Sequence, residues 1–186
     1  MPIKKNHDSA GIEPVKLISG FLYRHRDLYI AALEKMEKLY GPVELESEIF
    51  KFDHTSYYAK EMGNNLKRCF VSFEEPISPS RLRQCKLETN RIEQEFLNDS
   101  GGRTINIDPG MVGLANLTLA STKDFAHRLY LGDGIYGEVS MIYTDGEFTP
   151  LKWAYPDYQI DEVIQFLHRV RESLKDHIII LRRKDR

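Results

Sequence analysis

The chain has 186 residues, of which 41% are hydrophobic and 11% aromatic, which suits one domain with a well-formed core. Its formal net charge is −2, from 26 basic and 28 acidic residues, and the missing basic excess argues against nucleic acid as a partner. The N-terminal stretch has no apolar segment typical of a signal peptide, and no run approaches the ~18 apolar residues of a membrane span, so we expect a soluble cytoplasmic protein without a membrane partner.

The chain divides into three unequal parts. Residues 1–14 are polar and are expected to form a flexible N-terminal arm. A single α+β domain is expected over residues 15–181, followed by a solvated tail over residues 182–186. The spacing of Cys69 and Cys85 fits no zinc motif, so both are interpreted as small, buried, reduced residues.

Strand and helix patterns alternate through the first half of the domain. Apolar runs with β-branched and aromatic members predict strands, and a 3,4-spaced apolar stripe predicts the second helix. In chain order we expect a strand over 15–23, a helix from Asp27 to about Tyr40, a strand over 43–52, a loop over 53–65, a strand over 66–73, a helix from Ser78 to the glycines at 101–102, and a strand over 103–107. This β-α-β-β-α-β order predicts a ferredoxin-like core, with two helices on one face of a four-stranded antiparallel sheet.

The second half predicts an added β-meander and a C-terminal helix. Residues 111–122 are expected to form a short helix or an irregular connection. The runs 127–131, 136–143 and 148–153 predict strands, with turns at Gly132-Asp-Gly134 and at Asp145-Gly146. A helix is expected from about Ile160, and residues 178–181 could be either its end or a late strand.

Polar residues at the end of the predicted strand 103–107 are the first candidate site. Strand alternation places Asn106 and Asp108 on the same face. Two polar groups on one side of a buried strand need partners. Asp108 could cap the turn expected at Pro109-Gly110, or it could be a carboxylate that binds a cation or acts as a catalytic base.

The segment that follows carries the strongest charged cluster, made by Lys123, Asp124, His127 and Arg128. Lysine and arginine are the usual anion binders, and histidine titrates near neutral pH and can transfer protons. A surface salt-bridge network is the alternative interpretation. No second histidine at ligand spacing accompanies His127, so no metal site is expected, and the sequence identifies no cofactor.

The loop over 53–65 can approach this cluster. Tyr57 and Tyr58 would either cover the edge of the core or form the wall of a ligand pocket, and Glu61 would supply a polar or catalytic contact. The aromatic residues Trp153, Tyr155 and Tyr158 are interpreted as core and turn packing rather than as a platform for stacking bases.

Three long segments carry a family resemblance: FDHTSYYAKEMGNNLKRCFVSFEEPI, INIDPGMVGLANLTLASTKDFAHRLYLGDGIYGEVSMIY and WAYPDY. Together they resemble the bacterial and archaeal family called domain of unknown function 4416, over residues 15 to about 174. One departure is His54, which stands where an aromatic residue is more typical. The resemblance implies no established activity, although its members often carry the description GTP-binding protein.

The residues argue against classical GTP binding. A P-loop needs G-x-x-x-x-G-K-[ST], whose backbone N–H groups surround the phosphates, and the chain has no such segment. The spaced glycines from Gly132 to Gly137 lie between two predicted strands, which favours a hairpin turn instead.

Two functions from different classes remain. The first is an enzyme or binding protein for an anionic, phosphate- or carboxylate-bearing small molecule, including a nucleotide held without a P-loop. In that case Lys123, His127 and Arg128 would hold the anion, and Asp108 or Glu61 would act in proton transfer. The second is a non-catalytic ligand-binding or protein-interaction module, and an exposed edge strand of the meander could pair two copies into a homodimer.

Overall fold

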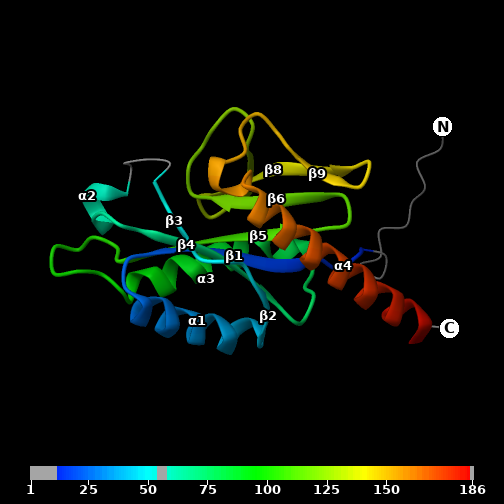
Figure 1. Cartoon of the computed structure of the whole chain (residues 1–186), viewed down its shortest axis with the longest axis horizontal. Helices are drawn as coiled ribbons and strands as arrows, with labels where there is room; N and C mark the ends of the chain where they lie inside the picture. Colours follow the sequence, from blue (N-terminus) through cyan, green and yellow to red (C-terminus); the bar gives the residue numbers. More distant parts are fainter. Residues whose placement is uncertain (1–11, 54–57, 185–186) are drawn as a thin grey trace.

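The computed structural model describes residues 12–53 and 58–184. Helices and strands together form a mixed α+β structure built on one large antiparallel sheet (Figure 1). Most of the expected N-terminal arm, residues 1–11, lies outside the described residues, as do residues 185 and 186 of the expected tail. No helix among the described residues is both long enough and apolar enough to cross a lipid bilayer.

Within residues 12–53 and 58–184, three longer helices and one short helix accompany the strands. The α-helices are α1 (Arg26–Tyr40), α2 (Ala59–Met62), α3 (Leu82–Gln94) and α4 (Asp161–Lys184), with 3-10 turns η2 (Pro79–Arg81) and η3 (Pro156–Tyr158). The strands are β1 (Lys16–Tyr23), β2 (Val43–Glu46), β3 (Phe50–Lys51), β4 (Lys67–Phe73), β5 (Ile105–Val112), β6 (Asn116–Ser121), β7 (Leu129–Gly132), β8 (Ile135–Thr144) and β9 (Glu147–Pro150).

The sheet has the strand order β2-β4-β1-β5-β6-β8-β7, with β3 added beside β4 and β9 beside β8. Strand β1 is central. It pairs with β4 on one side and with the whole of β5 on the other, from Lys16 opposite Val112 to Tyr23 opposite Ile105. The predicted strands 15–23 and 103–107 are therefore neighbours in the same sheet.

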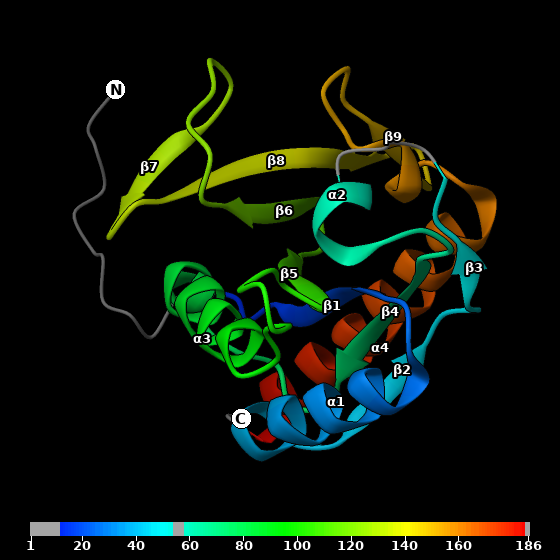
Figure 2. The same ribbon diagram turned by 90° about the vertical axis from the view of Figure 1, so that its left-hand side faces the viewer.

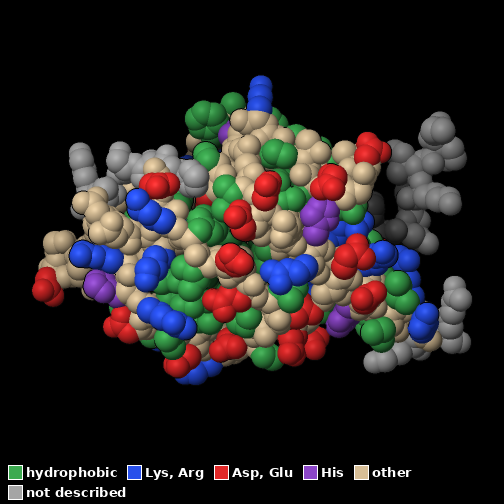
Figure 3. Space-filling model, viewed as in Figure 1, with side chains coloured by type: hydrophobic (Ala, Val, Ile, Leu, Met, Phe, Trp, Pro, Cys, Tyr) green, Lys and Arg blue, Asp and Glu red, His purple; other side chains and the backbone are tan. Residues whose placement is uncertain are grey.

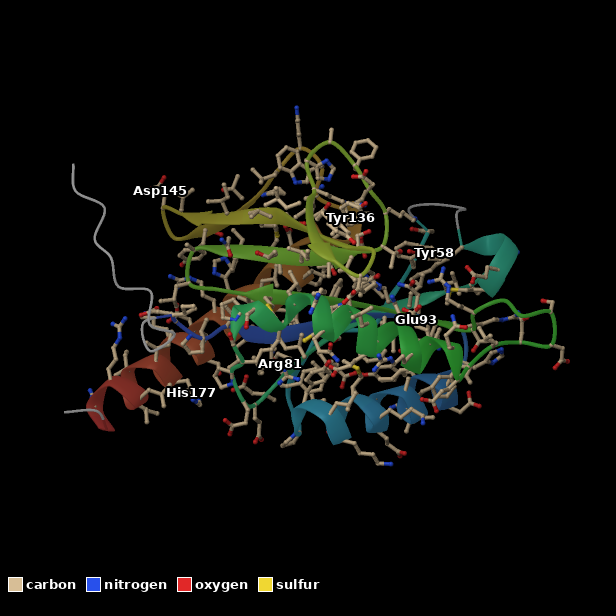
Figure 4. The ribbon with its side chains drawn as sticks, turned by 180° about the vertical axis from the view of Figure 1, so that it is seen from behind. Tyr58, Arg81, Glu93, Tyr136, Asp145 and His177 are labelled. Atoms are coloured by element: carbon tan, nitrogen blue, oxygen red, sulfur yellow. The ribbon has the colours of Figure 1, made fainter. Side chains whose placement is uncertain are left out.

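Helices cover both faces of the sheet. In Figure 1, α4 crosses in front of β1 and β5 while α3 lies behind them, and the reverse view in Figure 4 brings α3 and α1 to the front. Residues of β1, β4 and β5 such as Phe21 and Ile107 pack on α1 and α3. The opposite face, including Ile18 and Phe70, packs on Phe166 and Val170 of α4.

Strand β5 is longer than the sequence predicted. The expected strand ended at Ile107 with a turn at Pro109-Gly110, but β5 runs on to Val112. The N–H of Ile107 points away from β1 and donates to Glu93. Because backbone direction alternates along a strand, the nitrogen of Pro109 also points away from β1. Pairing with β6 begins only at Gly110, so no strand hydrogen bond is lost at this proline. At Gly110 a side chain would meet the Leu119 side chain at 2.6 Å, so glycine permits the close approach of β6.

The prediction for residues 111–122 was wrong as well. They complete β5 and form β6, in which the buried Leu117 and Leu119 alternate with half-buried Asn116 and Thr118. This two-residue period is that of a strand with one face on the core. Residues 178–181, left open between strand and helix, belong to α4.

The two hairpin turns are confirmed. Asp133 and Gly134 have φ values of 53° and 73°, and Asp145 and Gly146 have φ values of 52° and 90°. These left-handed pairs are the conformation of two-residue turns that match the twist of the flanking strands. The first turn joins β7 to β8 and the second joins β8 to β9, so the glycine-rich segment lies between strands.

A candidate ligand cavity where two strands separate

A cavity of about 850 Å³ opens where β5 and β6 diverge. Pairing between these strands is limited to Gly110–Val112 opposite Leu117–Leu119, whereas β1 follows β5 over its whole length. In Figure 2, β6 and β8 lie above β1 and β5, with α3 to one side. The cavity is lined from α3, β5 and β6, and also from the turn η3.

Side chains of α3 take the place of a neighbouring strand along the open edge of β5. The Ile107 N–H donates to Glu93 Oε1 at 2.7 Å, and Lys86 Nζ donates to the Ile107 carbonyl at 3.0 Å. Lys86 and Glu93 are seven residues apart and so share one face of the helix. Both backbone groups of a buried strand residue are thereby satisfied without a strand partner.

Asp108 lies at the centre of a charged group at the base of the cavity. Its carboxylate lies 3.3 Å from Arg68 Nη1 and 3.4 Å from Lys86 Nζ, and it accepts a hydrogen bond of 2.7 Å from Asn106 Nδ2. Its side chain is 30% exposed although the residue is in the middle of the sheet, because the cavity reaches it. Burial pushes the pKa of Asp108 up, but Lys86 and Arg68 outweigh it and hold that pKa below its ordinary value.

Arg68 is buried between two carboxylates and two aromatic rings. Its Nε lies 2.9 Å from Asp157 Oδ2, and its guanidinium lies 4.8 Å from the ring centroid of Phe70 and 5.8 Å from that of Tyr158. Gly20 of β1 makes room for it, because a Cβ at this position would be 2.8 Å from Arg68 Nη2. Buried charges are stable in proteins when they are paired in this way.

Arg103 ties three further polar residues together. It donates through Nε and Nη2 to the two carboxylate oxygens of Glu61, at 2.8 and 2.9 Å, and through Nη1 to Asn106 and Glu93. The hydrogen bonds from Arg103 lower the pKa of Glu61. Burial raises the pKa of Glu93 above its ordinary value, despite the nearby Lys86 and Arg103.

The opposite wall of the cavity is organised around Glu138 of β8. Its carboxylate accepts from Arg128 Nε at 2.6 Å and from the Ser140 hydroxyl at 3.1 Å, and it lies 2.8 Å from His127 Nε2. The His127 ring also stacks on Trp153, with 4.8 Å between centroids and 11° between planes. Glu138 lines the cavity, while His127 and Arg128 do not and stand beside it.

Arg128 also holds the rim. Its Nη1 donates to the Ser121 hydroxyl and to the Lys123 carbonyl, and its Nη2 donates to the Tyr155 hydroxyl at 2.8 Å. Ser121, Lys123 and Tyr155 all line the cavity. One guanidinium therefore joins Glu138 to three other parts of the cavity wall.

The structure divides the predicted site residues into two groups. Asn106, Asp108, Tyr58 and Lys123 line the cavity. Glu61, His127 and Arg128 are engaged with residues that line it, and Asp124 is exposed and is not part of the lining. Tyr57 lies outside the described residues. Tyr58 and Glu93, both labelled in Figure 4, reach the cavity from the residue just before α2 and from α3.

Seven charged residues of the site were missed by the sequence analysis: Arg68, Lys86, Arg91, Glu93, Arg103, Glu138 and Asp157. A signal existed for Arg68, because a charged residue stands inside the apolar strand KRCFVSF. Lys86 and Glu93 each follow a residue of the apolar stripe of α3, Cys85 and Ile92, and charged residues beside such a stripe normally face solvent. Here that flank of the helix faces the cavity.

Among residues 12–53 and 58–184, no group of three or more histidine, cysteine, aspartate or glutamate side chains could hold a metal ion. The carboxylates at the cavity are instead paired with arginine, lysine or histidine.

Comparison with known proteins places most of the chain in one family. Searches of curated proteins and of solved structures each found no significant match. The family model described as "Domain of unknown function (DUF4416)" matches residues 13–174, which include every residue that lines the cavity. The chain therefore belongs to the DUF4416 family.

Proposed function

We propose that the cavity between β5 and β6 binds an anionic small molecule that carries a phosphate or a carboxylate. The observation that carries the proposal is the charge of the lining. Among the described residues, five lining side chains are cationic, namely Arg68, Lys86, Arg91, Arg103 and Lys123, and four are carboxylates, namely Glu93, Asp108, Glu138 and Asp157.

The cationic side chains of the lining differ in their ion pairs. Arg68, Lys86 and Arg103 are each paired with a carboxylate, and Glu138 is paired outside the cavity with Arg128. Arg91 is exposed, lines the cavity and forms no ion pair with any described residue. A ligand anion would find a charge-assisted hydrogen bond at Arg91. The volume of about 850 Å³ is within the range of small-molecule sites.

Two carboxyl groups with opposite pKa shifts support a catalytic form of this proposal. Asp108 is held ionised at the base of the cavity, whereas burial raises the pKa of Glu93. Such a separation is how enzymes assign base and acid roles to two similar groups. Asp108 would accept a proton and Glu93 would return one. Glu61 and His127 would act through Arg103 and Glu138 rather than on the ligand.

The framework that we propose is a ferredoxin-like core in a cytoplasmic protein. Supporting it, β2-β4-β1-β5 are joined by α1 and α3, and both helices pack on the same face. A nucleotide would have to be bound without a P-loop. The face in Figure 3 shows acidic and basic side chains interspersed, which does not favour nucleic acid.

One observation favours the alternative of a non-catalytic interaction module. Strand β7 is at the end of the sheet, and its Leu129 and Tyr130 side chains are 74% and 63% exposed. Apolar side chains on an edge strand can pair with another chain, including a second copy.

The proposal is tested by thermal-shift and calorimetric titration with inorganic phosphate, phosphate esters, carboxylates and nucleotides. We expect Arg91→Ala to weaken anion binding by about tenfold or more, because a charge-assisted hydrogen bond is lost. The matched control is Arg83→Ala on the same helix, since Arg83 pairs with Asp133 and does not line the cavity. Equal affinities for the two variants would contradict the proposal. So would the absence of binding by every anion.

A further inference from the structure

Tyr158 lines the cavity and has a buried hydroxyl without a hydrogen-bond partner among the described residues. It ends η3 and is 1% exposed. Burial raises its pKa well above the ordinary value, so the hydroxyl keeps its proton. A buried hydroxyl without a partner is costly, and a ligand group that reached it would supply the missing partner.

Asp108 supplies the complementary group. Arg68 lies beside both residues, because its guanidinium is 3.3 Å from the Asp108 carboxylate and 5.8 Å from the centroid of the Tyr158 ring. The Asp108 carboxylate is held ionised and is partly exposed to the cavity, so it accepts hydrogen bonds and donates none. A donor and an ionised acceptor near each other complement hydroxyl groups, which accept from the first and donate to the second.

Aromatic rings flank this end of the cavity. Tyr155 and Tyr158 have ring centroids 6.5 Å apart, and Phe52 and Tyr58 have centroids 6.0 Å apart, and all four residues line the cavity. Such rings offer apolar faces to the C–H groups of a ligand, while the hydroxyls of the three tyrosines remain polar.

We propose that the ligand is an anionic polyol, such as a sugar phosphate or a sugar acid. Its hydroxyls would bind at Tyr158 and Asp108, and its anionic group at Arg91. The inference rests on the proposed function, because it names the class of anion that this cavity takes.

The first test compares probes of equal charge with and without hydroxyls by calorimetric titration. Glucose 6-phosphate is compared with butyl phosphate, and gluconate with hexanoate, and the two pairs also separate a phosphate from a carboxylate ligand. We expect the hydroxylated member of at least one pair to bind about tenfold tighter, which corresponds to one additional net hydrogen bond.

The second test is Tyr158→Phe, which removes only the hydroxyl. The affinity for the hydroxylated probe should fall about tenfold, whereas the affinity for its plain counterpart should change by less than about twofold. Because the hydroxyl has no partner, the variant should unfold at the same temperature as the original chain or at a higher one. Tyr23→Phe is the matched control, because Tyr23 is buried in the core between the sheet and α1 and does not line the cavity.

The outcomes separate the two proposals. If plain and hydroxylated anions bind equally, or if Tyr158→Phe weakens both to the same extent as Tyr23→Phe does, the polyol inference is overturned while anion binding stands. If none of the four probes binds while inorganic phosphate or a nucleotide does, the polyol inference alone is overturned. If no anion of either series binds, the proposed anion site is overturned as well.

Discussion

The carboxylate of Glu93 accepts a hydrogen bond from the backbone N–H of Ile107 at 2.7 Å, so a helix side chain fills the place of a β-strand. The same carboxylate lies 3.3 Å from Arg103. Glu93 thus closes the open edge of β5 and links it to the charged group at the base of the cavity.

Removing this carboxylate should destabilise the protein. Glu93→Ala leaves the Ile107 N–H without its partner, and we expect the free energy of unfolding to fall by about 2–3 kcal/mol. Glu93→Gln retains an oxygen that can accept the same hydrogen bond and should cost less. Urea denaturation of the two variants checks this order, and an alanine variant as stable as the glutamine variant would contradict it.

Asp108→Asn should show a pH-dependent loss of stability. The pKa of Asp108 is lower in the folded chain than in the unfolded one, so its carboxylate stabilises the fold above its ordinary pKa, and this contribution is lost as the pH falls through the folded value. We expect a loss of about 1–3 kcal/mol at pH 7, which shrinks toward zero as Asp108 becomes protonated in the original chain. Denaturant titrations at pH 7 and near pH 3 measure the difference in the free energy of unfolding between the original chain and Asp108→Asn. A difference that is the same at both pH values would be evidence against this electrostatic role.

Gly20→Ala should lower the stability of the protein, because the added methyl group would collide with Arg68 and Phe70. The added Cβ would lie 2.8 Å from both Arg68 Nη2 and the Phe70 ring, and Arg68 cannot move without leaving its carboxylate partners. We expect a loss of about 1–3 kcal/mol of stability. Gly113→Ala is the control, since its nearest contact would be an ordinary 3.4 Å and the expected change is below about 0.5 kcal/mol. Similar denaturation midpoints for the two variants would exclude the steric argument.

The two thiols should be inert in the folded protein. Cys69 and Cys85 are buried and unpaired, and burial raises the pKa of Cys69 to about 12 and also raises that of Cys85. Because the thiolate is the reactive form, a colorimetric thiol reagent at pH 8 should label neither residue in the native protein and both in denaturant. Rapid labelling of either one without denaturant would show that the core opens on the time scale of the assay.

Magnesium-dependent GTP binding of P-loop type is not expected. The glycines from Gly132 to Gly137 form the hairpin between β7 and β8, so they do not precede a helix and cannot surround a phosphate as a P-loop does. Calorimetric titration of GTP with and without magnesium measures this, and micromolar, magnesium-dependent affinity would contradict the prediction.

Regular patterns were readable from the sequence where one period governs a whole element. The apolar stripe of α3 is confirmed, with Cys85 and Thr89 fully buried. The turns at Gly132-Asp-Gly134 and at Asp145-Gly146 are confirmed as well. The extension of β5 was not readable, because Pro109-Gly110 normally ends a strand. It is tolerated here only because β6 separates from β5 at that point, which is a tertiary feature.

The candidate site was only partly readable for a similar reason. Asp108 stood out because a carboxylate followed a buried strand. Lys86 and Glu93 looked like ordinary exposed helix residues, and only the position of α3 beside the unpaired part of β5 reveals that they bind its backbone. The nearby His127 and Arg128 were identified as polar cluster members, but the sequence could not show that both turn toward Glu138.

The limited pairing of β5 with β6 has a consequence for how the cavity keeps its width. Only three residue pairs join the two halves of the sheet, so the backbone seam between them is short. One half contains β2, β4, β1 and β5, and the other contains β6, β8, β7 and β9. The long helix α4 contacts β2 and β1 in the first half and β9 in the second, and so holds the two halves together on the face away from α3. Its core residues Phe166 and Val170 do not line the cavity. Substitutions of Phe166 or Val170 would therefore change the width of the cavity, and with it the size of a molecule that could enter, without altering any residue that lines the cavity.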